Sequence, residues 1–287
     1  MWGLTPAAWA PRTRSTLDAE LRMSIAIVTG ASSGLGVHFA QQLARRDEVD
    51  AVWLVARRRD RLVAVAESLE GATGRVIVAD LSTTAGVRVL SSAIDTSTAP
   101  ITWLVNNAGF GHVGPFADMA RDRVSAMVDV NIGALTTITH ATLPHMTSGS
   151  RIVQVASSAG FGPMPTFAVY AASKAYVLHL SEALAAELEP SGITCTAVCP
   201  GPVNTEFAAV AAGEPTDALA PRSSAADPAD VVELAIRDAE RGKLRSVYGL
   251  PVKAWGVVSN LVPRRMALSA AAAYKRRSRP PAAGDES

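Results

Sequence analysis

Short apolar runs alternate along the chain with longer stretches in which apolar residues recur at helical spacing. Continuous apolar runs are typical of strands buried on both faces, and the longer stretches are typical of amphipathic helices. The alternation recurs about seven times, which predicts an α/β fold with a doubly wound parallel sheet of the Rossmann type. The expected strands span residues 24–28, 51–55, 75–79, 101–105, 151–156, 193–198 and 245–250. Residues 206–229, rich in Ala, Gly, Pro and Ser, are expected to form a long irregular lid or binding loop, and the helix after them to span about 228–240.

Both ends of the chain depart from this alternation. Residues 1–22 show neither period, so we expect an N-terminal extension, disordered or not native, ahead of a single folded domain over 23–250. Residues 251–287 begin with apolar residues at helical spacing and continue with the basic clusters 264–265 and 275–277. We expect a helical, basic tail that ends in disorder. It would dock on the core, on a second subunit or, by peripheral contact, on a membrane surface.

Composition and charge narrow the classes of protein further. The chain has 287 residues, of which 48% are hydrophobic, enough for a sizeable core. A formal net charge of +1 argues against nucleic acid or an anionic membrane as the main partner. No apolar run is long enough for a transmembrane segment. Cys195 and Cys199 lie apart on one face of an expected strand, which disfavours a disulfide and favours a reducing, cytoplasmic setting. His140 and His145 lack a ligand pattern, so no metal site is expected.

A glycine-rich loop, TGASSGLG at 29–36, joins the first expected strand to the first expected helix. Such a turn allows the backbone to approach a pyrophosphate, to which the helix N-terminus offers free N–H groups and a positive dipole end. The spacing differs from the general GxGxxG fingerprint, but the strand before it and the helix after it indicate nucleotide binding. The expected contacts are Gly30, Ser32, Ser33, Gly34, Leu35 and Gly36.

Arginines follow the second expected strand, at a position where an NAD-binding unit carries an acidic residue for the ribose 2′-hydroxyl. A guanidinium suits a 2′-phosphate because it is always charged and presents several donors. We therefore expect NADP(H), with Arg57 as the leading contact and Arg58 as the second, and NAD as the alternative cofactor. The competing interpretation is that residues 57–61 form a solvated helix start.

Two further strand ends carry polar residues. Asp80, with Leu81 beside it, follows the third expected strand, where its carboxylate would accept from an adenine amino group or cap the next helix. The fourth expected strand runs directly into NNAG at 106–109. Its small residues allow close approach of a cofactor and its amides tie neighbouring strands together. The expected contacts here are Asn107, Ala108 and Gly109.

Candidate chemistry is concentrated between Ser157 and Lys174. Tyr170 and Lys174 are four residues apart on an expected helix and share a face. A tyrosine normally titrates near pH 10, and a nearby cation favours its phenolate. Ser157 lies at the end of the fifth expected strand. Asn131 lies inside a long expected helix over 118–145, so its amide is either structural glue or part of a solvent relay.

Together these motifs resemble those of the short-chain dehydrogenase/reductase family. TGASSGLG looks like the family's glycine loop, NNAG like its turn, and Asn131 like its helix asparagine. Tyr170 and Lys174 match its YxxxK motif, with Ser157 as its serine. The resemblance covers roughly residues 24–250, and the arginines after the second strand look like a branch of NADP-preferring members with poorly defined substrates. It also implies cofactor contacts from a PGxVxT segment, namely Pro200, Gly201, Val203 and Thr205.

The resemblance implies an oxidoreductase that passes hydride between a nicotinamide cofactor and a carbonyl carbon. Tyr170 would give the carbonyl oxygen its proton, and Ser157, in preference to Ser158, would hydrogen-bond the same oxygen. Lys174 would hold the nicotinamide ribose, lower the pKa of Tyr170 and pass protons to water positioned by the Asn131 backbone. Thr205 would contact the carboxamide. The expected catalytic residues are Asn131, Ser157, Tyr170 and Lys174, of which Tyr170 and Lys174 also contact the cofactor.

The residues around these motifs are largely apolar, which predicts a hydrophobic ketone, aldehyde or secondary alcohol as the small-molecule substrate. We also expect a homodimer or homotetramer. Two other classes stay open: a non-catalytic dinucleotide-binding sensor or scaffold on the same fold, and a membrane-surface reductase of lipid-like substrates. The expected pocket residues are Phe110, Val113, Phe161, Met164, Phe167 and Phe207, with His112 as a polar contact.

Overall fold

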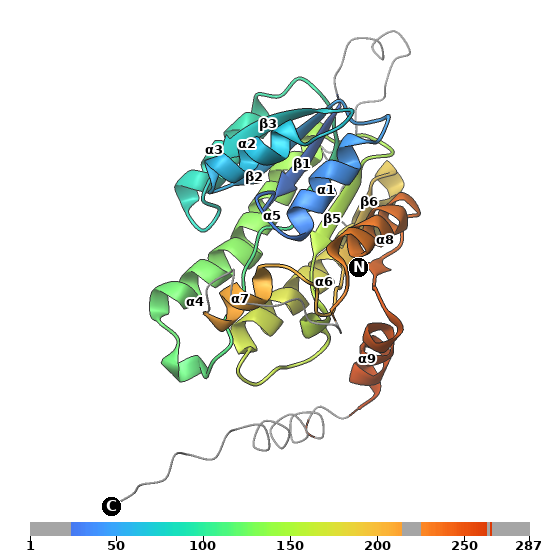
Figure 1. The fold of residues 1–287 in the computed structure, drawn as a ribbon. Helices are drawn as coiled ribbons and strands as arrows, with labels where there is room; N and C mark the ends of the chain where they lie inside the picture. Colours follow the sequence, from blue (N-terminus) through green and yellow to red (C-terminus); the bar gives the residue numbers. More distant parts are fainter. Residues whose placement is uncertain (1–23, 214–224, 263–264, 266–287) are drawn as a thin grey trace, which may run out of the picture.

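The computed structural model describes residues 24–213, 225–262 and 265, and in this part of the chain one parallel sheet of seven strands forms the centre of the molecule (Figure 1). Its strand order is β3-β2-β1-β4-β5-β6-β7, so the chain winds outward in one direction from β1 and then in the other from β4. The predicted doubly wound parallel fold is confirmed. The strands are β1 (Ile25–Thr29), β2 (Ala51–Ala56), β3 (Thr73–Val78), β4 (Ile101–Asn106), β5 (Arg151–Val155), β6 (Thr194–Val198) and β7 (Arg245–Ser246).

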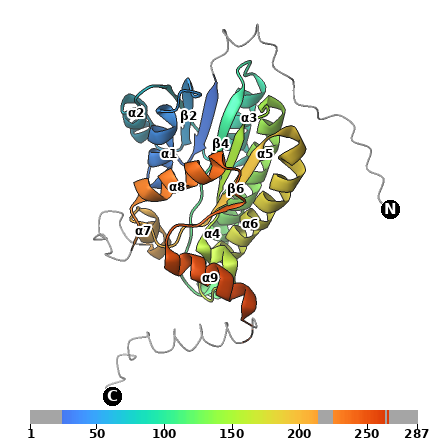
Figure 2. The ribbon, with the colours of Figure 1, turned by 90° about the vertical axis from the view of Figure 1, so that its right-hand side faces the viewer.

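Helices cover both faces of the sheet, as Figure 2 shows most clearly. On one face lie α1 (Leu35–Ala44), α2 (Arg59–Glu67) and α8 (Pro228–Glu240), and on the other lie α3 (Thr84–Asp95), α5 (Leu135–Thr142) and α6 (Ala168–Leu188). Alternate residues of each strand enter two separate cores. Val28 packs with α1 and α8, for example, whereas its neighbour Ile27 packs with α3 and α5. Burial on both faces explains why the strands are continuous apolar runs.

Three further helices, α4 (Arg121–Val128), α7 (Phe207–Ala212) and α9 (Leu250–Leu261), lie in the lower part of both ribbon views. Short 3₁₀ turns complete the description, at Phe116–Asp118, Leu143–His145, Ser158–Phe161 and Glu189–Ser191. None of the helices among the described residues is long and apolar enough to cross a membrane.

The sequence-based expectations for three elements need correction. The long helix expected over 118–145 is interrupted by a π-helical segment, Asp129–Ala134. The segment after residue 206, expected to be irregular, begins with α7. The last strand, expected over 245–250, covers only Arg245–Ser246, and Gly249, with φ of +86°, directly precedes α9. The predicted extension 1–22, and the tail beyond 262 apart from Arg265, lie outside the described residues.

Candidate active site

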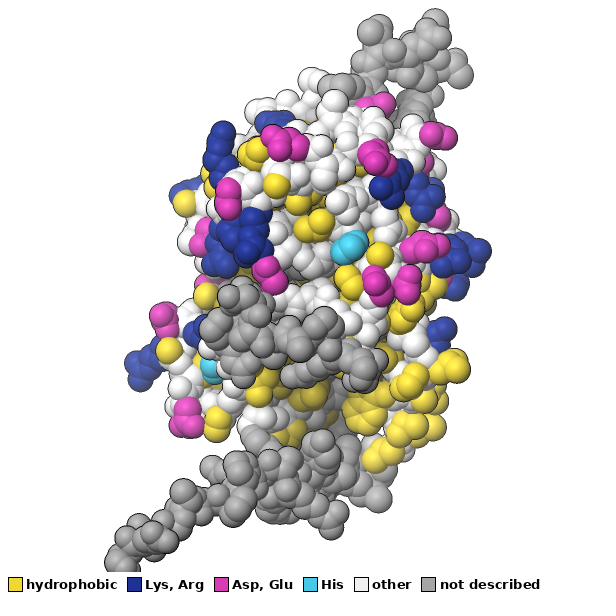
Figure 3. Space-filling model, viewed as in Figure 1, with side chains coloured by type: hydrophobic (Ala, Val, Ile, Leu, Met, Phe, Trp, Pro, Cys, Tyr) yellow, Lys and Arg dark blue, Asp and Glu magenta, His cyan; other side chains and the backbone are white. Residues whose placement is uncertain are grey.

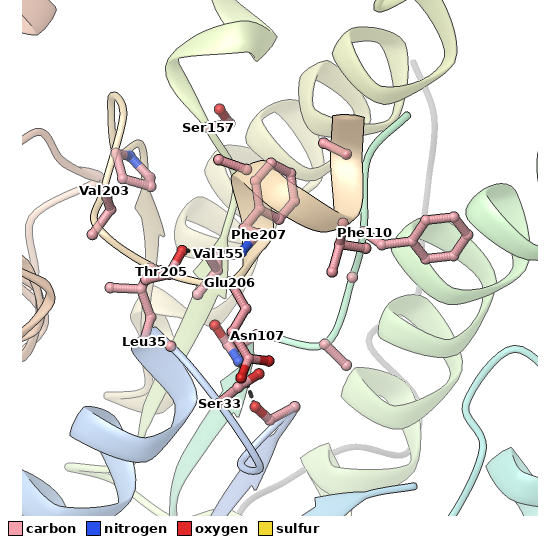
Figure 4. Close-up of a pocket in the computed structure, with 18 of the residues that line it drawn as sticks. Ser33, Leu35, Asn107, Phe110, Val155, Ser157, Val203, Thr205, Glu206 and Phe207 are labelled. Atoms are coloured by element: carbon pink, nitrogen blue, oxygen red, sulfur yellow. Dashed lines mark hydrogen bonds between the residues drawn. The ribbon is translucent and has the colours of Figure 1, made fainter. Parts of the chain in front are cut away.

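A cavity of about 1080 Å³ opens at the carboxyl ends of the central strands, where the winding direction of the sheet reverses. The glycine loop forms one part of its wall, and aromatic side chains form another (Figure 4). All the residues predicted to bind a cofactor line it except Gly36. They are Gly30, Ser32, Ser33, Gly34, Leu35, Arg57, Arg58, Asp80, Leu81, Asn107, Ala108, Gly109, Tyr170, Lys174, Pro200, Gly201, Val203 and Thr205.

The glycine loop is a tight backbone cradle. Gly30 has φ of +68°, a conformation that other residues rarely adopt. Gly36 is buried beneath the loop, where a Cβ would lie 2.2 Å from the Gly30 carbonyl oxygen. Gly36 is therefore needed for packing under the loop, and its contact with the cofactor stays a prediction. Glycine spacing alone does not distinguish these two roles.

Asn107 and Thr29 hold this loop against the end of β4. The Asn107 Nδ2 donates to the carbonyl oxygens of Thr29 at 2.9 Å and Gly30 at 3.2 Å. The Thr29 hydroxyl oxygen accepts from the backbone N–H groups of Asn107 and Ala108, both at 3.0 Å. The amide of Asn107 thus ties neighbouring strand ends together, as its sequence context indicated.

The two predicted arginines have different surroundings. Arg57 is exposed at the cavity edge, near enough to Asp80 to contribute to lowering its pKa. Arg58 is already bonded, since its Nε lies 3.3 Å and its Nη2 3.2 Å from the Ser32 hydroxyl, and its Nη1 3.2 Å from Glu206 Oε2. Arg61 also pairs with Glu206. The solvated-helix interpretation of these arginines does not describe Arg58.

Asp80 is held by its own turn. Its Oδ1 accepts from the Ser82 backbone N–H at 3.0 Å and the Ser82 hydroxyl at 2.7 Å. Burial alone would raise the pKa of Asp80, but these hydrogen bonds and Arg57 lower it overall. The cap of α3 is Thr83, so the alternative role of Asp80 as the helix cap is wrong. Leu81 lines the cavity, yet its side chain is 4% exposed and packs in the core.

Tyr170 lies between two aromatic rings. The ring of Phe167 stacks on it at 4.4 Å between centroids, and Phe207 lies at 5.3 Å. Burial raises the pKa of Tyr170 to about 12, while a hydrogen bond with the Ser157 side chain acts in the opposite direction. The phenol is therefore protonated at neutral pH and adjoins the Ser157 hydroxyl. Ser157, at the end of β5, also accepts from the Ala159 N–H at 3.1 Å.

Lys174 is almost completely buried one helical turn from Tyr170. Its Nζ donates to the Val155 carbonyl oxygen at 2.7 Å and lies 5.7 Å from the centre of the Tyr170 ring. Burial lowers the pKa of Lys174 to about 8, with Cys199 acting in the opposite direction. The expectation that Lys174 lowers the pKa of Tyr170 is wrong in this structure, because burial dominates the titration of both groups.

Asn131 does not line the cavity but supports it from behind. Its side chain is fully buried at the π-helical segment, where Oδ1 accepts from the Phe110 N–H at 3.1 Å. Its Nδ2 donates to the Phe110 carbonyl and the Ser173 hydroxyl, both at 3.0 Å. A Cβ on Gly109 would lie 2.8 Å from Asn131 Oδ1. The side chain is therefore structural glue for the NNAG turn, and the relay through its backbone stays a prediction.

The apolar part of the cavity contains most of the predicted pocket residues, namely Phe110, Val113, Met164, Phe167 and Phe207. Phe161 and His112 do not line it. Phe161 instead lies against α9, where a Cβ on Gly256 would be 3.2 Å from its ring. Sequence reasoning missed Glu206 and Trp255, which also line the cavity. Trp255 belongs to the helical pattern of the tail, but no sequence signal placed that helix at the pocket.

A family model described as short chain dehydrogenase matches residues 24–214. The chain belongs to the short-chain dehydrogenase family. It is therefore an oxidoreductase that acts on carbonyl or alcohol groups. Among the described residues of this short-chain dehydrogenase, no group of three or more His, Cys, Asp or Glu side chains is placed to hold a metal ion.

Individual relatives agree with this assignment. The chain is 34% identical over 221 residues to a sulfoacetaldehyde reductase 2 of Chromohalobacter salexigens, covering 73% of this chain and 86% of that protein. A short-chain dehydrogenase of Sphingobium yanoikuyae, solved in complex with NADPH, has a TM-score of 0.72 at 29% identity, covering 92% and 99% of the two chains. The bulky-bulky ketone specific alcohol dehydrogenase of Comamonas testosteroni has a TM-score of 0.70 at 28% identity, covering 91% and 97%.

Proposed function

We propose that this short-chain dehydrogenase transfers hydride between NADP(H) and an apolar ketone, aldehyde or secondary alcohol. The observation that carries the proposal is the position of Tyr170 and Ser157, whose side chains interact at the apolar wall of a cavity that also contains the glycine loop. This arrangement supports an enzyme over a sensor or scaffold, because nucleotide binding alone does not require a buried phenol beside a serine hydroxyl.

The residues present fit a dinucleotide. The loop from Gly30 to Gly34 has room for close backbone approach, with φ of +68° and +55° at its two ends, and the N-terminus of α1 follows it directly. Arg57 is exposed at the end of β2, where a 2′-phosphate is recognised in this kind of fold. The NADPH complex of the Sphingobium yanoikuyae relative supports the choice of NADP(H), with NAD as the alternative. When bound, the cofactor supplies or accepts the hydride.

The chain's own residues would manage the proton. Because burial keeps its pKa near 12, the Tyr170 hydroxyl retains its proton at neutral pH and is available to donate it to a carbonyl oxygen. The Ser157 hydroxyl would hydrogen-bond the same oxygen and stabilise its developing charge. Lys174 would hold the ribose next to the nicotinamide, and Thr205 the carboxamide. Asn131 would position the NNAG turn through Phe110 and would pass protons through water at its backbone.

The lining of the pocket favours apolar substrates. Phe110, Phe167 and Phe207 present aromatic surface near Tyr170, and Trp255 adds to it from α9. The similarity to a bulky-bulky ketone specific alcohol dehydrogenase supports a ketone or secondary alcohol among the candidates. The test is a cofactor-fluorescence screen of ketones, aldehydes and alcohols with NADPH and NADH. We expect turnover of apolar carbonyl compounds with NADPH, and turnover of only charged or sugar substrates would contradict the proposal.

We also propose that the protein is a cytoplasmic homodimer or homotetramer. Free, buried thiols at Cys195 and Cys199 support a reducing compartment. Apolar side chains gather over α9 in Figure 3, and Leu250 and Leu261 are 81% and 76% exposed. Such a face supports contact with a second subunit, and peripheral membrane contact through the tail is the alternative. Analytical ultracentrifugation tests the assembly, and liposome sedimentation with and without residues 253–287 tests the alternative.

A further inference from the structure

An acidic side chain occupies the arginine cluster at the cofactor end of the cavity. Glu206 follows directly after the predicted carboxamide contact Thr205 and pairs with both Arg58 and Arg61. Its side chain is 28% exposed, against 39% for Arg58 and 42% for Arg61, so the cluster is partly shielded from water. Burial alone would raise the pKa of Glu206, but the hydrogen bonds from the arginines lower it overall, which keeps the carboxylate charged.

The pairing with Glu206 involves an arginine that lies beside the glycine loop. Two of its nitrogens contact the hydroxyl of Ser32 in the glycine loop, and both residues line the cavity. The end of the second strand, beside that loop, is where this kind of fold recognises the 2′ substituent of the adenosine ribose. The Glu206 carboxylate therefore neutralises a guanidinium that faces the expected position of a 2′-phosphate, and a second anion there would experience its repulsion.

Glu206 also connects this end of the cavity with the catalytic end. Figure 4 shows Thr205, Glu206 and Phe207 on the segment that passes over the cavity, opposite Ser33 and Leu35 of the glycine loop. A Cβ on Gly34 would lie 3.2 Å from Thr205, so the segment packs closely on the loop. The next residue, Phe207, packs against Tyr170. Any change in the pairing of Glu206 acts on a segment that covers the reactive phenol.

We propose that Glu206 is a specificity-determining residue, which competes with the 2′-phosphate of NADP(H) for Arg58 and so limits the preference for NADP(H) over NAD(H). This inference rests on the proposed function. NADH lacks the 2′-phosphate and leaves the pair between Glu206 and Arg58 intact. Binding of NADPH shifts Arg58 toward the phosphate. This shift weakens the ion pair between Arg58 and Glu206, which anchors the segment above the cavity.

The test compares the dissociation constants of NADPH and NADH for the full-length protein and for Glu206→Gln, measured by cofactor fluorescence. The glutamine keeps the shape of the side chain and removes its charge. We expect NADPH to bind roughly fivefold to tenfold more tightly to the variant, with NADH within about twofold of the unaltered protein. The gain in NADPH affinity should shrink as salt is raised, because the repulsion that is removed is electrostatic.

Two further variants keep the result interpretable. Glu70→Gln is the matched control, since Glu70 pairs with Arg45 at 3.1 Å on an exposed surface away from the cavity. The affinities of this variant for NADPH and NADH should equal those of the unaltered protein. Glu206→Asp keeps the charge but shortens the reach toward two arginines, so it should give a smaller gain for NADPH. The ratio of its NADPH and NADH affinities also tests the proposal if the glutamine variant does not fold.

An unchanged ratio of NADPH to NADH affinity in Glu206→Gln, or a parallel loss of both, would overturn the role of Glu206 alone, provided the unaltered protein binds NADPH. If the unaltered protein bound neither NADPH nor NADH, the proposed function would be overturned, and this inference with it.

Discussion

Replacement of the buried Lys174 by methionine should change how stability depends on pH. Burial lowers the pKa of Lys174 from 10.5 to about 8. Between these values the unfolded chain holds a proton that the folded chain has released, so the free energy of unfolding rises with pH across this window. The depression corresponds to a gain on the order of 3 kcal/mol between pH 8 and pH 10.5. Lys174→Met removes the titrating group and with it this contribution.

The measurable quantity is the difference between the two proteins. Methionine leaves the Val155 carbonyl without its donor, a cost that does not depend on pH, so the absolute stabilities are not decisive. Urea unfolding at several pH values from 7.5 to 10.5 should show the wild type gaining on the variant by roughly 3 kcal/mol. Tyr170 and Cys199 titrate in both proteins and largely cancel from the difference.

Lys253→Met is the control, because Lys253 is exposed on α9, and its profile should run parallel to that of the wild type. If Lys174→Met also ran parallel to the wild type, the reasoning that burial suppresses the charge of this lysine would be refuted.

Three other substitutions test the walls of the site. Gly36→Ala should weaken NADPH binding at least about tenfold in a fluorescence titration, since its Cβ would lie 2.2 Å from the Gly30 carbonyl oxygen; unchanged affinity would contradict the cradle. Asn131→Ala should lower the free energy of unfolding by about 2–4 kcal/mol in urea, because it leaves the Phe110 backbone groups unpaired; a loss below about 0.5 kcal/mol would contradict this. Arg57→Ala should weaken the binding of NADPH at least about tenfold, measured by calorimetry, and leave the affinity for NADH unchanged. Equal effects on both cofactors would refute the role of Arg57 in binding the 2′-phosphate.

The fold was readable from the sequence because strands buried on both faces and amphipathic helices have different patterns. The helix α8 begins at Pro228, as predicted, because Asp227 caps it and proline suits its first turn. It ends at Glu240, which is also the predicted end. The end of the sheet was harder. β7 has only two residues, too few for a strand pattern, and a single glycine after it changes the direction of the chain.

The candidate site was readable as a set of motifs but not as a set of contacts. The partner of Arg58 is Glu206, which lies 148 positions further along the chain, and no local pattern joins them. Phe161 belongs to the same apolar loop as Phe167, yet one packs against α9 and the other against Tyr170. Loop residues have no period from which their direction can be deduced, whereas the helical spacing of Tyr170 and Lys174 was sufficient.

In the proposed mechanism, Tyr170 donates or accepts the proton in a hydride-transfer reaction at this cavity. Its most direct test is Tyr170→Phe, which removes one oxygen and keeps the ring between Phe167 and Phe207. With a substrate found in the screen, steady-state turnover with NADPH should fall at least about a thousandfold, within the range expected for loss of a general acid, while NADPH binds with unchanged affinity. Turnover within tenfold of the wild type would contradict the account.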